Sequence, residues 1–199
     1  MAASSNIATQ LLHWRTLSPS GVALIRNNLE AATQSFLQGT PVQLSGGYLQ
    51  ACATINSVAT AVIAGISTVP GASLASSGVA KTQNLTYSVP NQPNAVVIPL
   101  GAPPNDGTSQ FLLANPAQYF VGTVGNSNTA ANATLAITML GGIFGLTKDA
   151  GNGFWYIDNF ITTAAAGACV EIVNLISPVG TLNGLVEFRI TLAASQLTL

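Results

Sequence analysis

The chain has 199 residues, of which 48% are hydrophobic and only 6% are charged, and its formal net charge is −1. Ordinary soluble domains carry roughly 25% charged residues, so the surface of this protein is expected to be poor in charge. Three classes of protein share such a composition. They are membrane proteins, disordered chains, and proteins whose surface is largely covered by copies or partners.

The first two classes are excluded by the pattern of apolar residues. A membrane-spanning helix needs about 20 predominantly apolar residues, but polar residues interrupt the most apolar stretch, Ala51–Val69. Disordered chains are poor in apolar residues, whereas this chain is rich in them. The cores of obligate protein interfaces are depleted in charge. We therefore expect a large buried interface with other protein subunits and no contact with a membrane.

The basic residues and the termini point to an intracellular protein that does not bind nucleic acid directly. The five basic residues are scattered and form no run that could follow a phosphate backbone. The N-terminus lacks the basic and apolar segments of a secretory signal, so synthesis in the cytosol is expected. Cys52 and Cys169 could form a disulfide, but two buried free thiols fit this compartment better.

Residues 1–38 are predicted to form an N-terminal arm and one amphipathic helix. The arm is small and polar apart from Leu11, Leu12 and Trp14, so it is either a frayed terminus or a segment that orders against a neighbouring subunit.

The helix is predicted over Ser18–Gly39, because Ser18 can cap it, Pro19 suits its first turn and Gly39 its end. A three- and four-residue spacing places its apolar residues on one face. This face packs either on the sheet of its own chain or on another subunit. It consists of Val22, Ile25, Leu29, Ala32 and Phe36.

Residues 39–80 are predicted to form a first antiparallel β module. Pro41–Leu44 and Tyr48–Ala53 flank Ser45-Gly46-Gly47, which is a hairpin signal, and Ala61–Ser67 is a third strand. Residues 81–116 are rich in proline, which disfavours regular ladders. We expect a linker with edge strands at Thr82–Val89 and Ala95–Leu100, although an extended strap over a partner is the alternative.

Residues 117–199 are predicted to form a second β module. Asp149–Gly153 is expected to be the turn of a hairpin, after which Trp155 and Tyr156 pack across strands. Asn183-Gly184 is a turn dipeptide before a strand of alternating apolar and charged residues. The expected strands are Tyr119–Val124, Thr134–Leu140, Ile143–Thr147, Phe154–Asp158, Cys169–Leu175 and Gly184–Leu192. The predicted fold is therefore mainly β, with two sandwich-like or barrel-like modules joined by a Pro-rich linker.

No group of residues in the sequence is suited to catalysis or to a cofactor. His13 is the only histidine, which excludes a histidine metal cluster and leaves a catalytic triad without a credible base. Asp149 and Asp158 do not match the spacing of a calcium loop. Glu171 and Glu187, with Arg189 nearby, are expected to be surface charges, and no phosphate-binding glycine loop is present. We therefore expect neither an enzyme nor a metal or cofactor site.

Two groups of short motifs resemble the capsid decoration (cement) proteins of tailed bacteriophages. The first group is similar to their small β module and comprises Gly39–Cys52, Ala61–Ser67 and Pro70-Gly71. The second group is similar to a second β module of such virion proteins. It comprises Gly145–Asp149, Gly153–Asp158, Val170–Val173, Pro178–Gly180 and Gly184–Ile190. The chain departs from this family in its N-terminal segment with a capped helix.

The resemblance implies a virion structural protein on the capsid surface that is made in the bacterial host cytoplasm. It implies many copies, often homotrimers, that bind the major capsid protein and clamp neighbouring coat subunits, with no catalytic residue. The hypothetical partner interface then comprises Leu11, Leu12, Trp14, Val22, Ile25, Leu29 and Phe36. Two alternatives stay open: a low-copy tail, adaptor or fibre-base protein of the virion, and a non-viral β-rich surface binding module.

Overall fold

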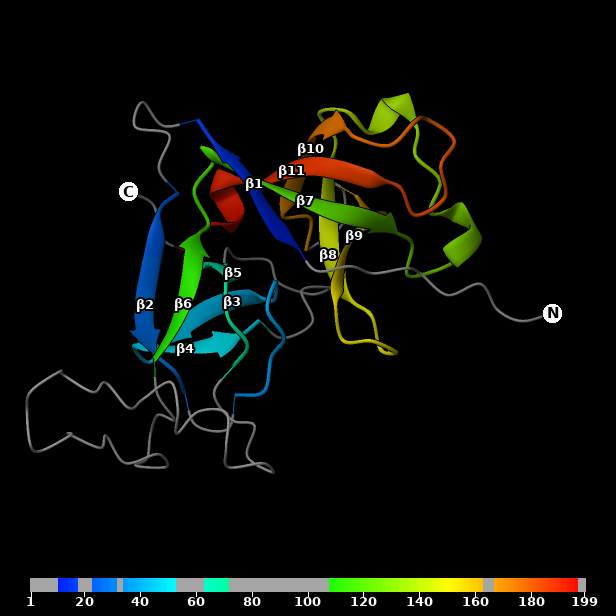
Figure 1. Cartoon of the computed structure of the whole chain (residues 1–199). Coiled ribbons are helices and arrows are strands. Elements are labelled where there is room, and N and C mark those ends of the chain that lie inside the picture. The colour runs from blue at the N-terminus through cyan, green and yellow to red at the C-terminus, as the bar shows by residue number, and fades with distance from the viewer. Residues whose placement is uncertain are drawn as a thin grey trace, which may run out of the picture.

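Two β-sheets pack against each other in the computed structural model of the chain (Figure 1). The structure describes residues 11–17, 23–31, 34–52, 63–71, 108–162 and 167–196. Within these residues the regular structure is β-strand, apart from three short 3-10 helices. The predicted mainly β fold with barrel-like and sandwich-like sheets is confirmed.

The larger sheet has six strands and closes into a barrel. Its order is β1-β7-β11-β10-β8-β9, and β7 also pairs in parallel with β9 through Val124 and Gly125. Strand β7 thus has β11 on one edge and both β1 and β9 on the other. The strands are β1 (Leu12–Thr16), β7 (Gln118–Gly125), β8 (Ile143–Lys148), β9 (Trp155–Thr162), β10 (Val170–Leu175) and β11 (Leu185–Ile190).

The smaller sheet has five strands in the order β2-β6-β5-β3-β4. Its two outer strands approach each other at one end, where Glu30 forms a parallel bridge with Leu49. There the N–H of Ala31 donates to the carbonyl of Leu49 at 2.8 Å. The strands are β2 (Ile25–Leu29), β3 (Pro41–Ser45), β4 (Tyr48–Ala51), β5 (Gly65–Ser67) and β6 (Thr108–Leu113).

The two sheets share one main hydrophobic core. Ile66 and Leu112 of the five-stranded sheet belong to the same buried cluster as Phe120, Ile157 and Phe188 of the barrel. Because this cluster spans both sheets, the sheets form one continuous packed unit. A second, smaller cluster lies within the five-stranded sheet and includes Phe36, Val42, Leu49 and Phe111.

The C-terminal segment ties the two sheets together. Beyond the 3-10 helix η4 (Leu192–Ala194), Ser195 forms a bridge with Ile63. The side-chain amide of Gln196 accepts the N–H of Leu44 at 2.7 Å and donates to its carbonyl at 2.6 Å. The C-terminal segment thus fastens the end of the barrel to β3 and to Ile63, two residues before β5.

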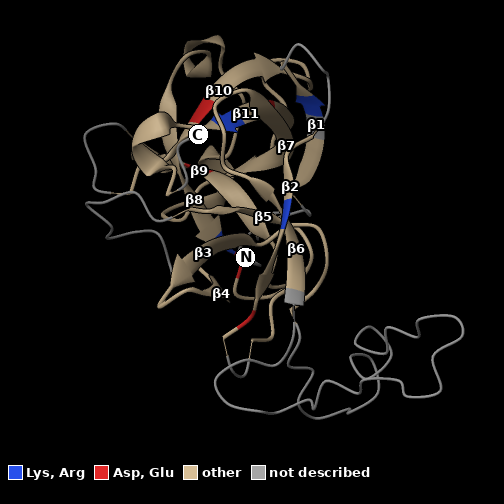
Figure 2. Ribbon diagram, turned by 90° about the vertical axis from the view of Figure 1, so that its left-hand side faces the viewer, with Lys and Arg blue, Asp and Glu red and all other residues tan. Residues whose placement is uncertain are grey.

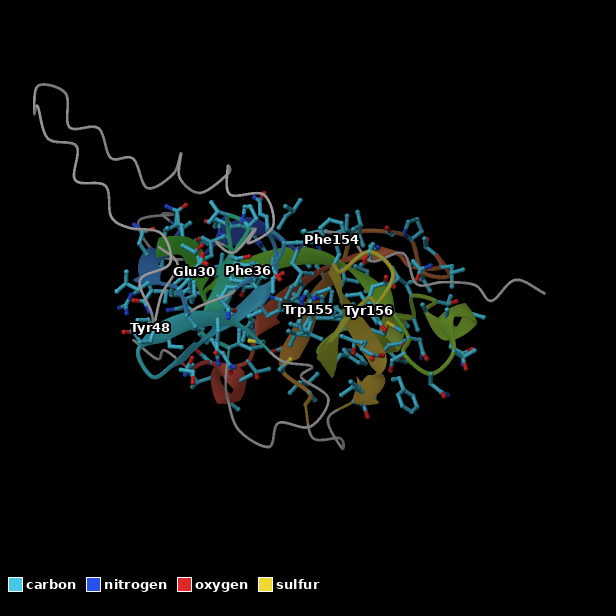
Figure 3. The ribbon with its side chains drawn as sticks, turned by 90° about the horizontal axis from the view of Figure 1, so that it is seen from below. Glu30, Phe36, Tyr48, Phe154, Trp155 and Tyr156 are labelled. Atoms are coloured by element: carbon cyan, nitrogen blue, oxygen red, sulfur yellow. The ribbon has the colours of Figure 1, made fainter. Side chains whose placement is uncertain are left out.

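The predicted hairpin turn at Asp149–Gly153 is confirmed, and it joins β8 to β9. The carboxylate of Asp149 accepts the N–H groups of Gly151 and Asn152 at 2.8 and 2.9 Å, and Gly153 has φ +78°. Trp155 and Tyr156 are both buried just after the turn (Figure 3). Successive strand residues point to opposite faces, so β9 is covered on both faces here.

Most of the predicted strands from residue 41 onward correspond to β3, β4, β7, β8, β9, β10 and β11. The strand predicted over Thr134–Leu140 is wrong, because this segment has an isolated bridge at Thr134 and the 3-10 helix η3 (Ile137–Met139). The apolar residues of this segment do not alternate inward and outward along a ladder. Of the strand predicted over Ala61–Ser67, only Gly65–Ser67 forms β5, and residues 61 and 62 lie outside the described residues.

The helix predicted over Ser18–Gly39 is wrong where the structure describes this segment. Residues Ile25–Leu29 form β2, which pairs antiparallel with β6 over five residues. Ile25 and Leu29 are four residues apart, and this spacing places two residues on one face of a strand as well as of a helix. The three- and four-residue spacing that predicted the helix includes this four-residue interval, which fits both structures, and pairing with β6 decides between them.

Part of the predicted 81–116 linker is a central strand of the smaller sheet. Strand β6 lies between β2 and β5 and pairs with both. The edge strands predicted at Thr82–Val89 and Ala95–Leu100 lie outside the described residues, as do Ser18, Val22 and Ala32.

Candidate interaction surfaces

The described part of the chain shows no cluster of metal-binding side chains. It contains no group of three or more His, Cys, Asp and Glu side chains that could hold a metal ion. His13 Nε2 lies 3.0 Å from Thr16 Oγ1, and its ring lies edge-on to Phe120 with 6.1 Å between the ring centroids. Burial lowers the pKa of His13. This histidine therefore packs as a neutral ring at the base of β1.

A row of charged residues crosses the outer face of the barrel. Arg189 Nη2 and Nε donate to one carboxylate oxygen of Glu171 at 2.8 and 2.9 Å, across the β10–β11 ladder. Arg15 Nε donates to Glu187 at 2.5 Å. Glu187 was predicted to be a surface charge, and this is wrong, since its side chain is only 2% exposed beneath Arg15.

A buried aspartate holds a loop against the barrel. Asp158 is fully buried, and its Oδ1 accepts the N–H groups of Ser127 and Phe160 at 3.1 Å each. Its Oδ2 accepts the hydroxyl of Thr147 at 2.7 Å. Asn126 continues the network, because its side-chain oxygen accepts the N–H of Thr129 at 2.7 Å. Through these contacts Asp158 supports the 126–129 loop.

Cys52 and Cys169 are buried free thiols, as predicted. They lie in the main core, Cys52 at the end of β4 and Cys169 before β10. Burial raises the pKa of Cys169 to about 12, and burial together with the nearby Cys169 raises the pKa of Cys52 as well. Neither thiol is therefore a nucleophile at neutral pH.

The structure separates the residues predicted to form a partner interface into two groups. Leu11 and Phe36 are buried in the cores of their own chain. Leu12, Ile25 and Leu29 are exposed. The backbone of Trp14 belongs to β1 but its side chain is outside the described residues, and so is Val22 altogether.

The exposed members of this set lie on β1 and β2. These two strands and Leu17, the residue after β1, are called the edge strands here. Strand β2 is the end strand of the five-stranded sheet. Strand β1 stands at one end of the strand order of the six-stranded sheet, where it pairs with β7. Leu12, Leu17, Ile25 and Leu29 are between 43% and 57% exposed there. Native proteins usually protect such edges with charge or with a covering segment, but the only charged residues on β1 and β2 are Arg15 and Arg26.

A second exposed apolar surface lies at one end of the barrel, and it is called the loop surface here. Two segments form it, Ala133–Leu140 and the connection between β10 and β11, which Figure 1 shows together at the upper right. Six large apolar side chains in and beside these segments are between 36% and 63% exposed. They are Ile137, Leu140, Ile176, Val179, Leu182 and Leu185.

Backbone hydrogen bonds hold the two segments of the loop surface side by side. Leu135 donates its N–H to Thr181 at 3.0 Å and accepts that of Gly180 at 2.9 Å. Thr134 and Leu182 form an antiparallel bridge, and the N–H of Asn183 donates to Ala133 at 2.8 Å. The two segments therefore lie side by side as one hydrogen-bonded unit at the end of the barrel.

The loop surface carries no charge. Residues 107–147 and 172–186 contain no Asp, Glu, Lys or Arg. In Figure 2, red and blue ribbon is limited to short segments, among them parts of β1, β2, β10 and β11. A contiguous exposed apolar surface without charge is typical of a protein–protein contact.

Sequence reasoning missed the loop surface. The available signal was the apolar side chains at turn positions, since Ile176, Val179 and Leu182 stand beside Pro178, Gly180 and Asn183. Turn residues are usually polar, so apolar residues at turn positions were the signal in the sequence for an exposed apolar surface.

Comparisons with known proteins give no relative: no family model matches the chain, and neither do the curated proteins or the solved structures. Within the described segments, no helix has the length and apolar character that crossing a membrane requires.

Proposed function

We propose that this chain is a virion structural protein that binds the outer face of an icosahedral phage head and clamps neighbouring coat subunits. The major capsid protein is its partner, and the protein acts as a homo-oligomer, with a trimer favoured. It needs neither a cofactor nor a catalytic residue for this role.

One observation carries the proposal: a charge-poor β-fold exposes large apolar side chains on the edge strands and on the loop surface. The edge strands expose four large apolar residues, and the loop surface exposes six. In Figure 1, β2 lies at the left of the molecule and the loop surface at the upper right. A chain with two such surfaces can contact two neighbours at once, which is what clamping requires.

The physical mechanism is linkage. A protein that binds only the assembled shell stabilises that state by mass action. Contacts of about 1,600 Å² are typical of stable protein interfaces, and repetition around a shell multiplies their effect. The shared core of the two sheets makes the chain a rigid connector between its two apolar surfaces.

The test is the number of copies of this chain per coat subunit in gradient-purified particles of the phage that encodes it. A ratio near one, or a simple fraction set by the lattice, is expected. Absence from particles would overturn the proposal and favour the non-viral surface module.

Surface variants make this test specific. Purified chain is added to particles that lack it, and the bound amount is measured for the natural protein and for Leu29→Asp on β2. We expect Leu29→Asp to lower occupancy. The matched control is Leu192→Asp on η4, where Leu192 is 61% exposed but belongs to neither surface, and it should bind like the natural protein.

The second candidate is a low-copy tail, adaptor or fibre-base protein of the virion. The same two apolar surfaces favour it, because such proteins also contact two different neighbours. A few copies per particle, confined to one vertex in electron micrographs of labelled particles, would favour it over the decoration role.

A further inference from the structure

We propose that β2 binds an extended segment of a coat subunit as an added β-strand, with an acidic side chain of that segment opposite Arg26. The contact lies along residues 25–27, which are called the free edge here. The inference rests on the proposed function, because the coat subunit is the partner, and it states how the edge strands hold that partner.

The hydrogen-bond pattern determines which backbone groups of β2 point away from its sheet. The N–H of Leu113 on β6 donates to the carbonyl of Leu24 at 2.9 Å. Residues along an antiparallel pair alternate between bonding to the partner strand and facing away from it. In the register of β2 with β6, Arg26 therefore faces β6, and the N–H and C=O groups of Ile25 and Asn27 point outward.

No strand in the described part of the chain covers the free edge. Strand β4 approaches β2 at the end of β2, where Glu30 forms a parallel bridge with Leu49 and the side-chain amide of Asn28 donates to the carbonyl of Gly47 at 3.1 Å. In a parallel pair, residues before Glu30 face residues before Leu49. However, β4 begins at Tyr48, and the chain before it turns back to β3 at Gly47, which has φ +86°. Residues 25–27 therefore lie beyond the start of β4.

The outward backbone groups of the free edge specify an extended partner. An extended peptide presents N–H and C=O groups at the spacing of a strand, so one segment can pair with both Ile25 and Asn27. A helix uses these groups in its own hydrogen bonds. The side chain of Ile25 is 49% exposed at this edge and offers an apolar cross-strand contact. The expected partner is therefore a strand with an apolar residue facing Ile25.

Arg26 specifies the charge of the partner. Its side chain is exposed, and it has no ion pair with any described residue. It is the blue segment of β2 in Figure 2. Arg15 and Arg189, by contrast, are paired with Glu187 and Glu171. Opposite charges on neighbouring strands stabilise a sheet, so an acidic side chain on the added strand matches Arg26.

A second copy of this chain fits the free edge less well than a coat segment. Antiparallel pairing of two β2 strands about Asn27 would place Ile25 opposite Leu29 of the other copy. Leu29 stands beside Glu30, where β4 already meets β2. The same pairing would bring both Arg26 side chains to one face of the sheet, and like charges on neighbouring strands are destabilising. The free edge therefore selects a different chain.

The test is binding of the full-length purified chain to particles that lack it, measured as the concentration that gives half-saturation. Asn27→Pro removes the outward N–H and keeps the pairing with β6, because proline is accepted on an edge strand where its missing N–H faces solvent. Asn27→Ala removes the same side chain but keeps the N–H. Asn27→Pro should need at least about tenfold more protein than Asn27→Ala for half-saturation.

A second pair of variants tests the acidic side chain of the partner. Arg26→Glu should bind at least about tenfold more weakly than Arg26→Lys, because it opposes two like charges. The matched control is Leu192→Asp on η4, which adds a negative charge outside the edge strands and the loop surface, and it should bind like the natural protein. Circular dichroism melts show whether each variant is folded.

Amide hydrogen exchange of the natural protein provides a measurement that needs no substitution. The amides of Ile25 and Asn27 should exchange rapidly in the free chain and slowly on particles, because the added strand accepts their hydrogen bonds. The amide of Arg26 faces β6 and should be protected in both states. This measurement decides the question if Asn27→Pro does not fold.

Three results would overturn the inference. Equal binding by Asn27→Pro and Asn27→Ala, with the natural protein bound, would remove the added strand and leave the proposed function standing. Failure of the natural protein to bind particles would remove both. An oligomer of the purified chain that Asn27→Pro dissociates but Asn27→Ala does not, as seen by sedimentation velocity, would assign the free edge to a second copy.

Discussion

Arg15 and Glu187 form an ion pair that reaches across an intervening strand. Arg15 lies on β1 and Glu187 on β11, and both strands pair with β7. The guanidinium carbon of Arg15 lies 4.9 Å from the centre of the Tyr119 ring on β7, and its Nε donates to Glu187 at 2.5 Å. The hydrogen bond with Glu187 raises the pKa of Arg15. The first strand of the chain is thus fastened to the last strand of the barrel.

We expect Arg15→Ala to destabilise the protein more than Glu187→Gln does. Removing the cation leaves a carboxylate buried without its partner, which is costly, whereas Glu187→Gln removes the charge and keeps the volume. The double variant Arg15→Ala/Glu187→Gln should therefore be more stable than Arg15→Ala alone. Urea denaturation of the three variants measures this coupling. Strictly additive changes in the free energy of unfolding would show that the pair has no coupling.

The parts of the fold that the sequence predicts well depend on local chemistry. Val186, Phe188 and Ile190 alternate with charged residues, and all three are fully buried on β11. Asn183 before this strand has φ +51°, a conformation that asparagine tolerates. Period-two alternation and turn residues act within a few positions, so they can be recognised without knowledge of the partner strand.

The parts that could not be predicted depend on distant partners. Strand β2 pairs with β6, so Ile25 faces Leu112 from a position 87 residues earlier in the chain. No local signal specifies this pairing, and the spacing of Ile25 and Leu29 suits either structure. The burial of Glu187 has the same origin, because the cover over its carboxylate is supplied by Arg15 from the opposite end of the sequence.

The candidate surfaces were predictable only in part. The low charge of the chain led to the expectation of an extensive protein contact, and three of the residues named for it, Leu12, Ile25 and Leu29, are exposed. Leu11 and Phe36 are buried in their own chain, because exposure depends on where the strands are placed. An apolar residue in the sequence looks the same whether it fills a core or faces solvent.

Asp158→Ala should destabilise the protein by about 2–4 kcal/mol, because it removes the acceptor of two N–H groups and of a hydroxyl in a buried site. The matched control is Asp149→Ala at the exposed hairpin turn, where loss of the side-chain acceptor should cost about 0.5–1.5 kcal/mol. Urea denaturation provides both values. Equal losses at the two positions would contradict the supporting role assigned to Asp158.

Gly122→Ala should destabilise the barrel by displacing the residue before β1. A Cβ at position 122 would lie 2.6 Å from Leu11 Cδ2 and 2.9 Å from Ile157 Cδ1. Overpacking of this kind costs about 1–3 kcal/mol. In a Leu11→Ala background the first of these contacts is absent, so the same substitution should cost less. Thermal melts of the natural protein and of the three variants measure the coupling, and an unchanged cost in the Leu11→Ala background would show that Leu11 does not occupy this site.

Protonation of His13 on β1 should lower the free energy of unfolding as the pH falls. Because burial lowers the pKa of His13 in the folded protein below its ordinary value of 6.5, the unfolded state takes up a proton first as the pH falls. The stabilising effect of neutral His13 is therefore present above pH 6.5 and is lost as the pH falls towards the lowered pKa. His13→Gln should flatten this part of the curve of unfolding free energy against pH. A variant with an unchanged slope between neutral and mildly acidic pH would contradict this assignment.

Neither cysteine should react with a thiol reagent while the protein is folded. Burial raises the pKa of Cys169 to about 12 and raises that of Cys52 too, so almost no thiolate is present at neutral pH, and the core excludes the reagent. Titration with a disulfide reagent should detect no thiol in the native chain and both in the unfolded chain. Cys52→Ser provides the control, since its unfolded form should show one thiol. Rapid reaction of the native protein would mean that the core shared by the two sheets opens readily, which is incompatible with a rigid connector between the two apolar surfaces.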